Sequence, residues 1–116
     1  MSVDFDPTDA IRTRAAAFPS VAPGTSCNQS AFKVGKRAFL YIGPGARGRG
    51  FKAMFKLDRS MPRARELASA HPDRFEVGST GWVTTRFTAE EPLPEDLWQE
   101  WLEESYDLAG GGVARG

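Results

Sequence analysis

The strand-like pattern at residues 51–57 is the feature that most constrains the fold class of this chain. In the run Phe51-Lys-Ala-Met-Phe-Lys-Leu57, apolar residues alternate with Lys or Met, which is the period of a half-buried strand. A continuous apolar run at 38–42 precedes it and is too short for a helix. The connection between the two runs is also too short for a parallel crossover, which requires a dozen or more residues. The pattern therefore predicts neighbouring antiparallel strands.

The connection itself contains Gly43-Pro-Gly45-Ala-Arg-Gly48, which matches the G-x-G-x-x-G fingerprint of dinucleotide-binding proteins. That fingerprint requires a helix after the glycines, because the helix N-terminus binds the pyrophosphate. Here a strand-like run follows, and Asp58–Pro62 interrupts it. The acidic residue expected about 20 positions further on would be Glu66, which lies in a predicted helix. We therefore interpret 43–50 as a flexible glycine-rich connection between strands.

The rest of the chain predicts an α+β protein. Helices are expected at 6–18, with Asp6 as the cap, at 60–71, with Ser60 as the cap, and from Pro92–Pro94 to about Leu108. Strands are expected at 31–34, 38–42, 51–57, 75–77 and 82–87, whereas 19–26 is expected to be a loop. The order is α-β(3)-α-β(2)-α, a two-layer sandwich with an antiparallel sheet and its helices on one face. Residues 1–109 would form one domain and 110–116 a flexible Gly-rich tail.

Composition and cysteine content exclude several classes of protein. With 41% hydrophobic and 26% charged residues, the chain has the composition of an ordinary soluble domain. Neither a membrane-spanning run nor a signal-peptide pattern is present, so we expect a cytoplasmic protein without a membrane partner. Cys27 is the one cysteine, so neither an internal disulfide nor a disulfide-linked partner is expected.

Residues suited to catalysis or metal binding are scarce. Cys27 and His71 would be the one nucleophile and base pair, but without a local motif they are better explained as a small buried thiol and a helix-end histidine. One His and one Cys also cannot build a closed zinc site. The acidic run Glu90–Asp107 is interpreted as the solvated face of the last helix, the alternative being loose binding of a hard cation. We therefore expect no enzyme, no cofactor and no metal site.

The net charge of zero conceals a segregation of charge along the chain. Ten basic residues and one acidic residue lie between Lys33 and Arg65, whereas Glu90–Asp107 contains eight acidic residues and no basic one. Strand alternation places part of the basic block on the uncovered face of the sheet, beside the aromatic Trp82. Such cations neutralise phosphates, and an indole stacks on an unpaired base. The candidate nucleic-acid-binding residues are Lys33, Lys36, Arg37, Arg47, Arg49, Lys52, Lys56, Trp82 and Arg86.

The same charge pattern also fits a protein that binds no nucleic acid. An antiparallel sheet with one solvated face carries Lys and Arg in any case, and a register shift of one residue would move Trp82 into the core. The basic block would also match the acidic last helix of the same chain or of a second copy. The alternative function is accordingly a protein-interaction or self-assembly module, with a homo-oligomer or a protein partner instead of DNA.

Three stretches, PGTSCNQSAFKVGKRAFLYI, FEVGSTGWVTTRF and LPEDLWQEWLEESYDLA, resemble the MmcQ/YjbR family of small bacterial proteins. The resemblance covers roughly 6–109 and is clearest at Phe32–Lys36, Trp82-Val83 and Ser105-Tyr106. It implies a compact α+β fold similar to type III secretion chaperones and to the frataxin-like CyaY group. It also implies DNA binding through two protruding wings, one of which would include Arg47 and Arg49. It implies no catalytic residues.

Overall fold

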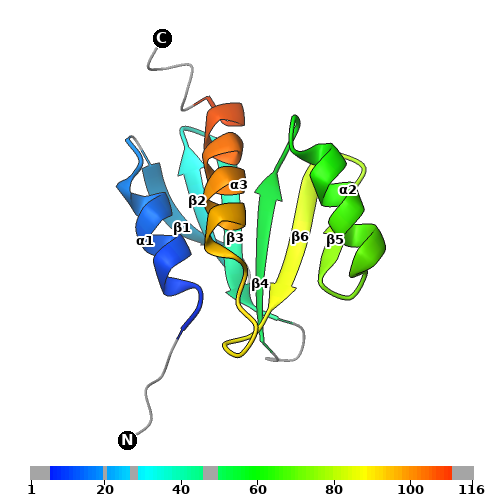
Figure 1. Ribbon diagram of the computed structural model, residues 1–116. Helices are drawn as coiled ribbons and strands as arrows, with labels where there is room; N and C mark the ends of the chain where they lie inside the picture. Colours follow the sequence, from blue (N-terminus) through cyan, green and yellow to red (C-terminus); the bar gives the residue numbers. More distant parts are fainter. Residues whose placement is uncertain (1–5, 20, 27–28, 46–49, 111–116) are drawn as a thin grey trace, which may run out of the picture.

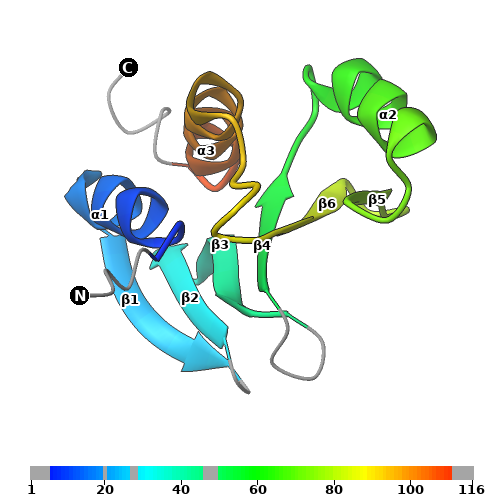
Figure 2. The same ribbon diagram turned by 60° about the horizontal axis from the view of Figure 1, so that its bottom comes forward.

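The computed structural model describes residues 6–19, 21–26, 29–45 and 50–110, and these residues form a sheet with three helices on one of its faces (Figure 1). The elements in chain order are α1 (Asp9–Ala17), β1 (Val21–Ser26), β2 (Gln29–Val34), β3 (Arg37–Pro44), β4 (Phe51–Lys56), α2 (Met61–Ala70), β5 (Phe75–Val77), β6 (Trp82–Phe87) and α3 (Glu95–Leu108). Within this part of the chain the strand order in the sheet is β1-β2-β3-β4-β6-β5, and every neighbouring pair is antiparallel. The predicted α+β architecture, with helices on one face, is confirmed (Figure 2).

The sheet has one strand more than the sequence predicts. Residues 19–26 were expected to be a loop, but Val21–Ser26 forms β1 and pairs with β2 from Val21↔Val34 to Ser26↔Gln29. Pro23 and Gly24 lower the strand propensity of this segment, which is why its sequence indicates a loop. β1 lies at the edge of the sheet, where a proline without an N–H is tolerated because one side of the strand needs no ladder bond.

The beginning of α1 also differs from its prediction. The helix starts at Asp9 with Thr8 at the N-cap position, two residues after the expected cap Asp6. Asp6 forms the preceding turn instead: its carboxylate accepts hydrogen bonds from the backbone N–H of Thr8 at 2.8 Å and from the Thr8 hydroxyl at 2.6 Å. A short polar side chain that bonds two residues ahead favours a turn over a helix.

The core lies between the helices and the sheet and is strongly aromatic. Trp101 of α3 contacts Phe55 of β4 and Phe75 of β5 in edge-to-face geometry, with ring centroids 6.0 Å apart in both pairs. Toward the other edge, Tyr106 contacts Phe39 edge to face, with ring centroids 5.3 Å apart. Phe39 and Tyr106 are both almost fully buried and belong to this core.

A strand follows the glycine-rich connection, as predicted. β3 and β4 pair from Leu40↔Phe55 to Pro44↔Phe51, and the backbone N–H of Gly45 donates to the carbonyl of Gly50 at 3.0 Å. The segment after the glycines is therefore the strand β4. A pyrophosphate site would require a helix N-terminus at this position. Residues 46–49 lie outside the described part of the chain.

Candidate functional site: the open face of the sheet

The face of the sheet away from the helices carries aromatic and basic side chains side by side. We call it the open face; its members on β3, β4, β5 and β6 are Tyr41, Lys52, Met54, Lys56, Glu76, Trp82, Thr84 and Arg86. Their sequence neighbours, such as Phe55 and Val83, are buried on the helix side. The alternation predicted from the sequence thus holds, and Lys52, Lys56, Trp82 and Arg86 share one surface.

An aromatic pair with a lysine beside it forms one end of the open face. Trp82 is half-buried there, so the register that would put it in the core is excluded. Its ring centroid lies 5.3 Å from that of Tyr41, and the Lys56 ammonium lies 5.7 Å from the Trp82 centroid. At this distance the lysine and the indole attract one another through a cation–π interaction. Arg37 lines the same cavity, of about 470 Å³, as Tyr41, Lys56 and Trp82.

The other end of the open face holds a partly compensated pair of cations. Lys52 and Arg86 lie directly opposite one another on β4 and β6. Arg86 donates to the Glu76 carboxylate at 2.6 Å, and both side chains are largely exposed. The hydrogen bond from Arg86, its charge and the charge of Lys52 lower the pKa of Glu76. Three cations thus face one anion on the described open face, and its local charge is positive.

The remaining candidate residues lie on the first hairpin or outside the described residues. Lys33, Lys36 and Arg37 are exposed where β2 turns into β3. Arg37 joins the aromatic end of the open face, whereas Lys33 and Lys36 are placed on the hairpin without a described contact to it. Arg47, Arg49 and Cys27 fall among the residues that the structure does not describe.

The acidic last helix does not cover the open face. α3 packs on β3 and β4 from the opposite side of the sheet (Figure 2). Arg59 of the basic block approaches α3, with its Nε 3.9 Å from Glu104 Oε1. Most of α3 therefore lies on the side of the sheet opposite the open-face cations, while Ser105, Leu108 and Ala109 at its C-terminal end line the cavity that also contains Lys56 and Arg37.

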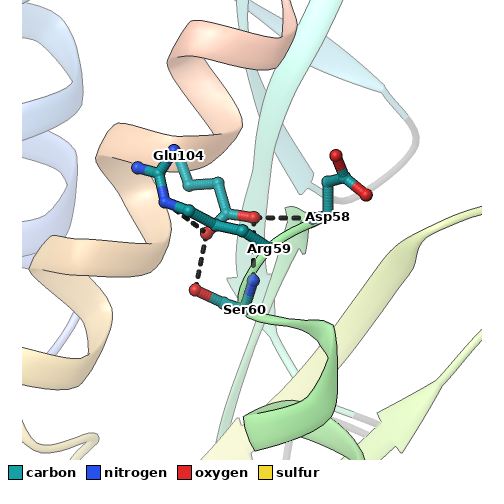
Figure 3. Close-up of polar contacts among 4 residues, drawn as sticks. All are labelled: Asp58, Arg59, Ser60 and Glu104. Carbon is teal, nitrogen blue, oxygen red and sulfur yellow. Dashed lines mark hydrogen bonds and ion pairs between the residues drawn. The ribbon is translucent and has the colours of Figure 1, made fainter.

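Glu104 corrects the expectation that the acidic residues of the last helix are solvated. Its side chain is 2% exposed and points from α3 to the start of α2 (Figure 3). One carboxylate oxygen accepts from the backbone N–H groups of Asp58 and Ser60, at 2.6 and 3.1 Å, and the other from the Ser60 hydroxyl at 2.5 Å. Burial raises the pKa of Glu104, but the three hydrogen bonds and the charge of Arg59 outweigh it, and the net shift is downward.

This arrangement also corrects the role predicted for Ser60. Ser60 occupies the N-cap position of α2, but its hydroxyl makes no capping bond to its own helix and donates to Glu104. The carboxylate is the acceptor for the N–H of the N-cap residue Ser60 and of Asp58 before it, and it places negative charge at the N-terminus of α2, where the helix dipole favours it. Local sequence patterns cannot predict an N-terminal acceptor that lies 44 residues away in the chain.

The two residues after Glu104 join other parts of the fold to α3. The Ser105 hydroxyl accepts from the backbone N–H of Lys56 at 2.8 Å and donates to the carbonyl of Phe39 at 2.5 Å. It thereby bridges β3 and β4 just beyond their last register pair, Leu40↔Phe55. The Tyr106 hydroxyl donates to the carbonyl of Pro19, two residues after the end of α1, at 2.7 Å.

Sequence reasoning missed Glu104, although a signal was present. Glu104 follows Trp101 by three residues and Leu97 by seven, which places it on the same helical face as both. A carboxylate inside an apolar helical stripe indicates a buried partner.

We searched the described residues for groups that could bind a metal ion and for helices that could span a membrane. Among them, no group of three or more His, Cys, Asp or Glu side chains is arranged to bind a metal ion. None of the helices in this part of the chain is both long enough and apolar enough to span a bilayer.

Comparison with known proteins identifies the family. The model of the YjbR family matches residues 16–108. The crystal structure of the Deinococcus radiodurans protein DR2400, with the domain DUF419, superposes with a TM-score of 0.67 at 25% identity, covering 89% of this chain and 80% of that one. No curated protein matches the chain. Because the family model spans most of the sequence and the fold agrees, the chain belongs to the YjbR family.

Proposed function

We propose that this protein binds single-stranded nucleic acid on the open face, as a binding protein without catalytic activity. The observation that carries the proposal is the Tyr41–Trp82 pair on the sheet face away from the helices. Lys56 and Arg37 lie beside it, and Ser105 and Leu108 at the end of α3 line the same cavity. Stacking on an aromatic ring suits any unpaired base, and cations beside the ring neutralise the backbone phosphates. Lys52 and Arg86 would extend the phosphate track along the strands, about 13 Å from Lys56 at the rise of a β-strand.

The absence of catalysis is part of the same proposal. Glu104 is the buried acid of the described chain, and both of its oxygens accept hydrogen bonds from the protein itself. The other carboxylate with a displaced pKa, Glu76, is exposed and paired with Arg86. Neither group is placed to exchange a proton with a substrate in an enclosed site.

A salt titration tests the electrostatic part of the proposal. The affinity for a fluorescent oligo(dT) strand should fall with salt, with a slope of about −0.7 per neutralised phosphate. Replacing Lys52 and Lys56 with Ala should therefore reduce the slope by about 1.4 if each lysine contacts one phosphate. The matched control is Arg63→Ala with Arg65→Ala, which removes the same charge from exposed positions of α2 on the other side of the sheet. Equal loss in both double variants, or no binding at low salt, would refute the proposal.

Tryptophan fluorescence tests the stacking part. Trp98 and Trp101 are 5% and 1% exposed in the core, so Trp82 is the indole that an oligonucleotide can reach. Binding should quench part of the emission in the wild type, and Trp82→Leu should abolish the quenching and weaken binding. A loss of about 1–3 kcal/mol is expected for one stacked base. Quenching that persists in Trp82→Leu would place the ligand elsewhere.

A further inference from the structure

A groove between α2 and α3 is lined by residues of both helices. The two helices lie on the face of the sheet opposite the open face (Figure 2). The volume of the groove is about 790 Å³. α2 packs on β5, whereas α3 packs on β3 and β4, so the two helices stand on different parts of the sheet. The groove is the space that this divergence leaves in the helical layer.

The inner lining of the groove is apolar. Phe75 and Trp101 line it and belong to the buried core. Leu67 of α2 and Leu97 of α3 line it as well, and both are only half-buried although they pack against that core. Leucines that remain half-exposed on two helices facing a common groove provide apolar area that a partner side chain can cover.

The walls of the groove carry opposite charge. On the side of α2 the lining includes Arg63 and, after the helix, Arg74, whereas on the side of α3 it includes Asp96 and Glu100. Arg63 approaches Glu66 of its own helix at 3.9 Å, but both side chains are well exposed, and such a surface pair contributes little. A complementary partner therefore needs acidic groups toward α2, basic groups toward α3 and apolar groups between them.

We propose that this groove binds an amphipathic helix of a partner protein, with an apolar stripe, one acidic flank and one basic flank. A helix can present three such lanes side by side, whereas an extended strand has two faces. α2 spans ten residues, or about 15 Å, so a partner helix of similar length would fill the groove with apolar residues at i, i+3 or i+4, and i+7.

A second copy of this chain fits the groove poorly. α3 contains no Lys or Arg and would place further acidic groups against Asp96 and Glu100. α1 keeps its apolar residues Ile11 and Ala15 buried in its own core. α3 thus lacks a basic flank, and α1 lacks a free apolar stripe. α2 carries Arg63 and Arg65 but a single acidic residue, Glu66, which lies 3.9 Å from its own Arg63. A different protein is therefore favoured as the partner.

Binding of a designed peptide tests the proposal. The probe is a helical peptide of about 14 residues with a leucine stripe, glutamates on one flank and lysines on the other. Titrated into the isotope-labelled protein, it should shift the NMR signals of Leu67, Phe75, Leu97 and the Trp101 indole. Leu97→Gln should weaken binding at least about tenfold. The matched control is Leu108→Gln on the same helix, whose side chain is 38% exposed outside the groove, and it should leave binding unchanged.

A charge reversal keeps the test decisive if Leu97→Gln unfolds the protein. Glu100 is exposed, so Glu100→Lys should fold normally, weaken the mixed-flank peptide and strengthen a peptide whose two flanks are both acidic. The proposal is overturned if the groove signals do not move at about 1 mM peptide, if Leu97→Gln and Leu108→Gln act alike, or if an all-lysine peptide binds as tightly as the mixed one. Oligo(dT) should not displace the peptide, because the open face lies on the other side of the sheet.

Discussion

Replacing Glu104 with glutamine should destabilise the protein at neutral pH and have a much smaller effect in acid. Glutamine has the same shape and retains an oxygen for the backbone N–H groups of Asp58 and Ser60, while the Ser60 hydroxyl can turn to accept from the new amide. What the variant removes is the negative charge. It therefore isolates the charge-assisted part of the contact between α3 and α2.

The magnitude follows from the three hydrogen bonds. A bond to a charged group contributes about 1.5–3 kcal/mol, against about 1 kcal/mol for a neutral one. Three such differences, reduced by the lower desolvation cost of a neutral amide, give a loss of about 2 kcal/mol for Glu104→Gln. Glu104→Ala leaves the same donors without a partner and should cost about 3–5 kcal/mol. Against a total stability of about 6–17 kcal/mol for a chain of this length, both losses are measurable.

The pH dependence has a defined sign. The pKa of Glu104 is lowered in the folded protein from its usual value of 4.5. A group with a depressed folded pKa stabilises the fold fully above its unfolded pKa, and that contribution is lost as the pH falls through the folded pKa. The difference in unfolding free energy between wild type and Glu104→Gln should therefore be constant near neutral pH and shrink below pH 4.5.

Urea denaturation at neutral and acidic pH measures the effect, from midpoints at constant slope. The control is Glu103→Gln, the same substitution one residue earlier, where the side chain is 53% exposed and pairs with Arg14 on the surface. That pair should contribute no more than about 1 kcal/mol. The reasoning is refuted if Glu103→Gln costs as much as Glu104→Gln, or if the cost of Glu104→Gln is the same at both pH values.

Three further substitutions, measured by the same denaturation assay, test other contacts that stabilise the fold. Ser105→Ala removes the bridge between Lys56 N–H and the Phe39 carbonyl and should cost about 2–3 kcal/mol; a cost below that of an exposed Ser→Ala would contradict the bridging role. Tyr106→Phe removes one hydrogen bond but retains the ring, so about 1 kcal/mol is expected, and a loss as large as that of Tyr106→Ala would not fit. Gly50→Ala should cost more than Gly35→Ala: both glycines have φ near +60°, but a Cβ at Gly50 would lie 2.7 Å from a backbone oxygen, whereas that at Gly35 meets open space.

Helices and strands whose own residues show the period of the element could be predicted from the sequence. β4 and β6 were recognisable because apolar residues alternate along each of them, and the same alternation placed Lys52, Lys56, Trp82 and Arg86 on one surface. β1 was not recognisable, because its strand conformation comes from pairing with β2 and its own residues include Pro23 and Gly24. Pairing of this kind depends on a neighbour in space and leaves no period in the segment itself.

Glu104 shows a second limit of local patterns. An acidic run on a surface helix is normally solvated, and this is true of exposed members such as Glu100 and Glu103. Whether a particular carboxylate is buried depends on its position in the helical turn and on a donor set 44 to 46 residues away. The position of Glu104 in the helical turn could have been used to predict its burial. Its hydrogen-bond donors could be identified only once the fold was known.

The residues that make the family resemblance clearest are mostly residues that hold the fold together. Phe32 is buried in the core, Ser105 bridges two strands and Tyr106 fixes the end of α1. Trp82 is an exception, since its side chain lies on the open face. Membership in the YjbR family therefore accounts for the architecture of this chain, while its ligands have to be sought on the surfaces of the molecule. The open face and the groove between α2 and α3 are two such surfaces, on opposite sides of one sheet. Leu97 and Glu100 lie in the first half of α3, whereas residues 104–106 lie in its second half. Substitutions at Leu97 and Glu100 should thus change binding in the groove, whereas substitutions at residues 104–106 should change the free energy of unfolding.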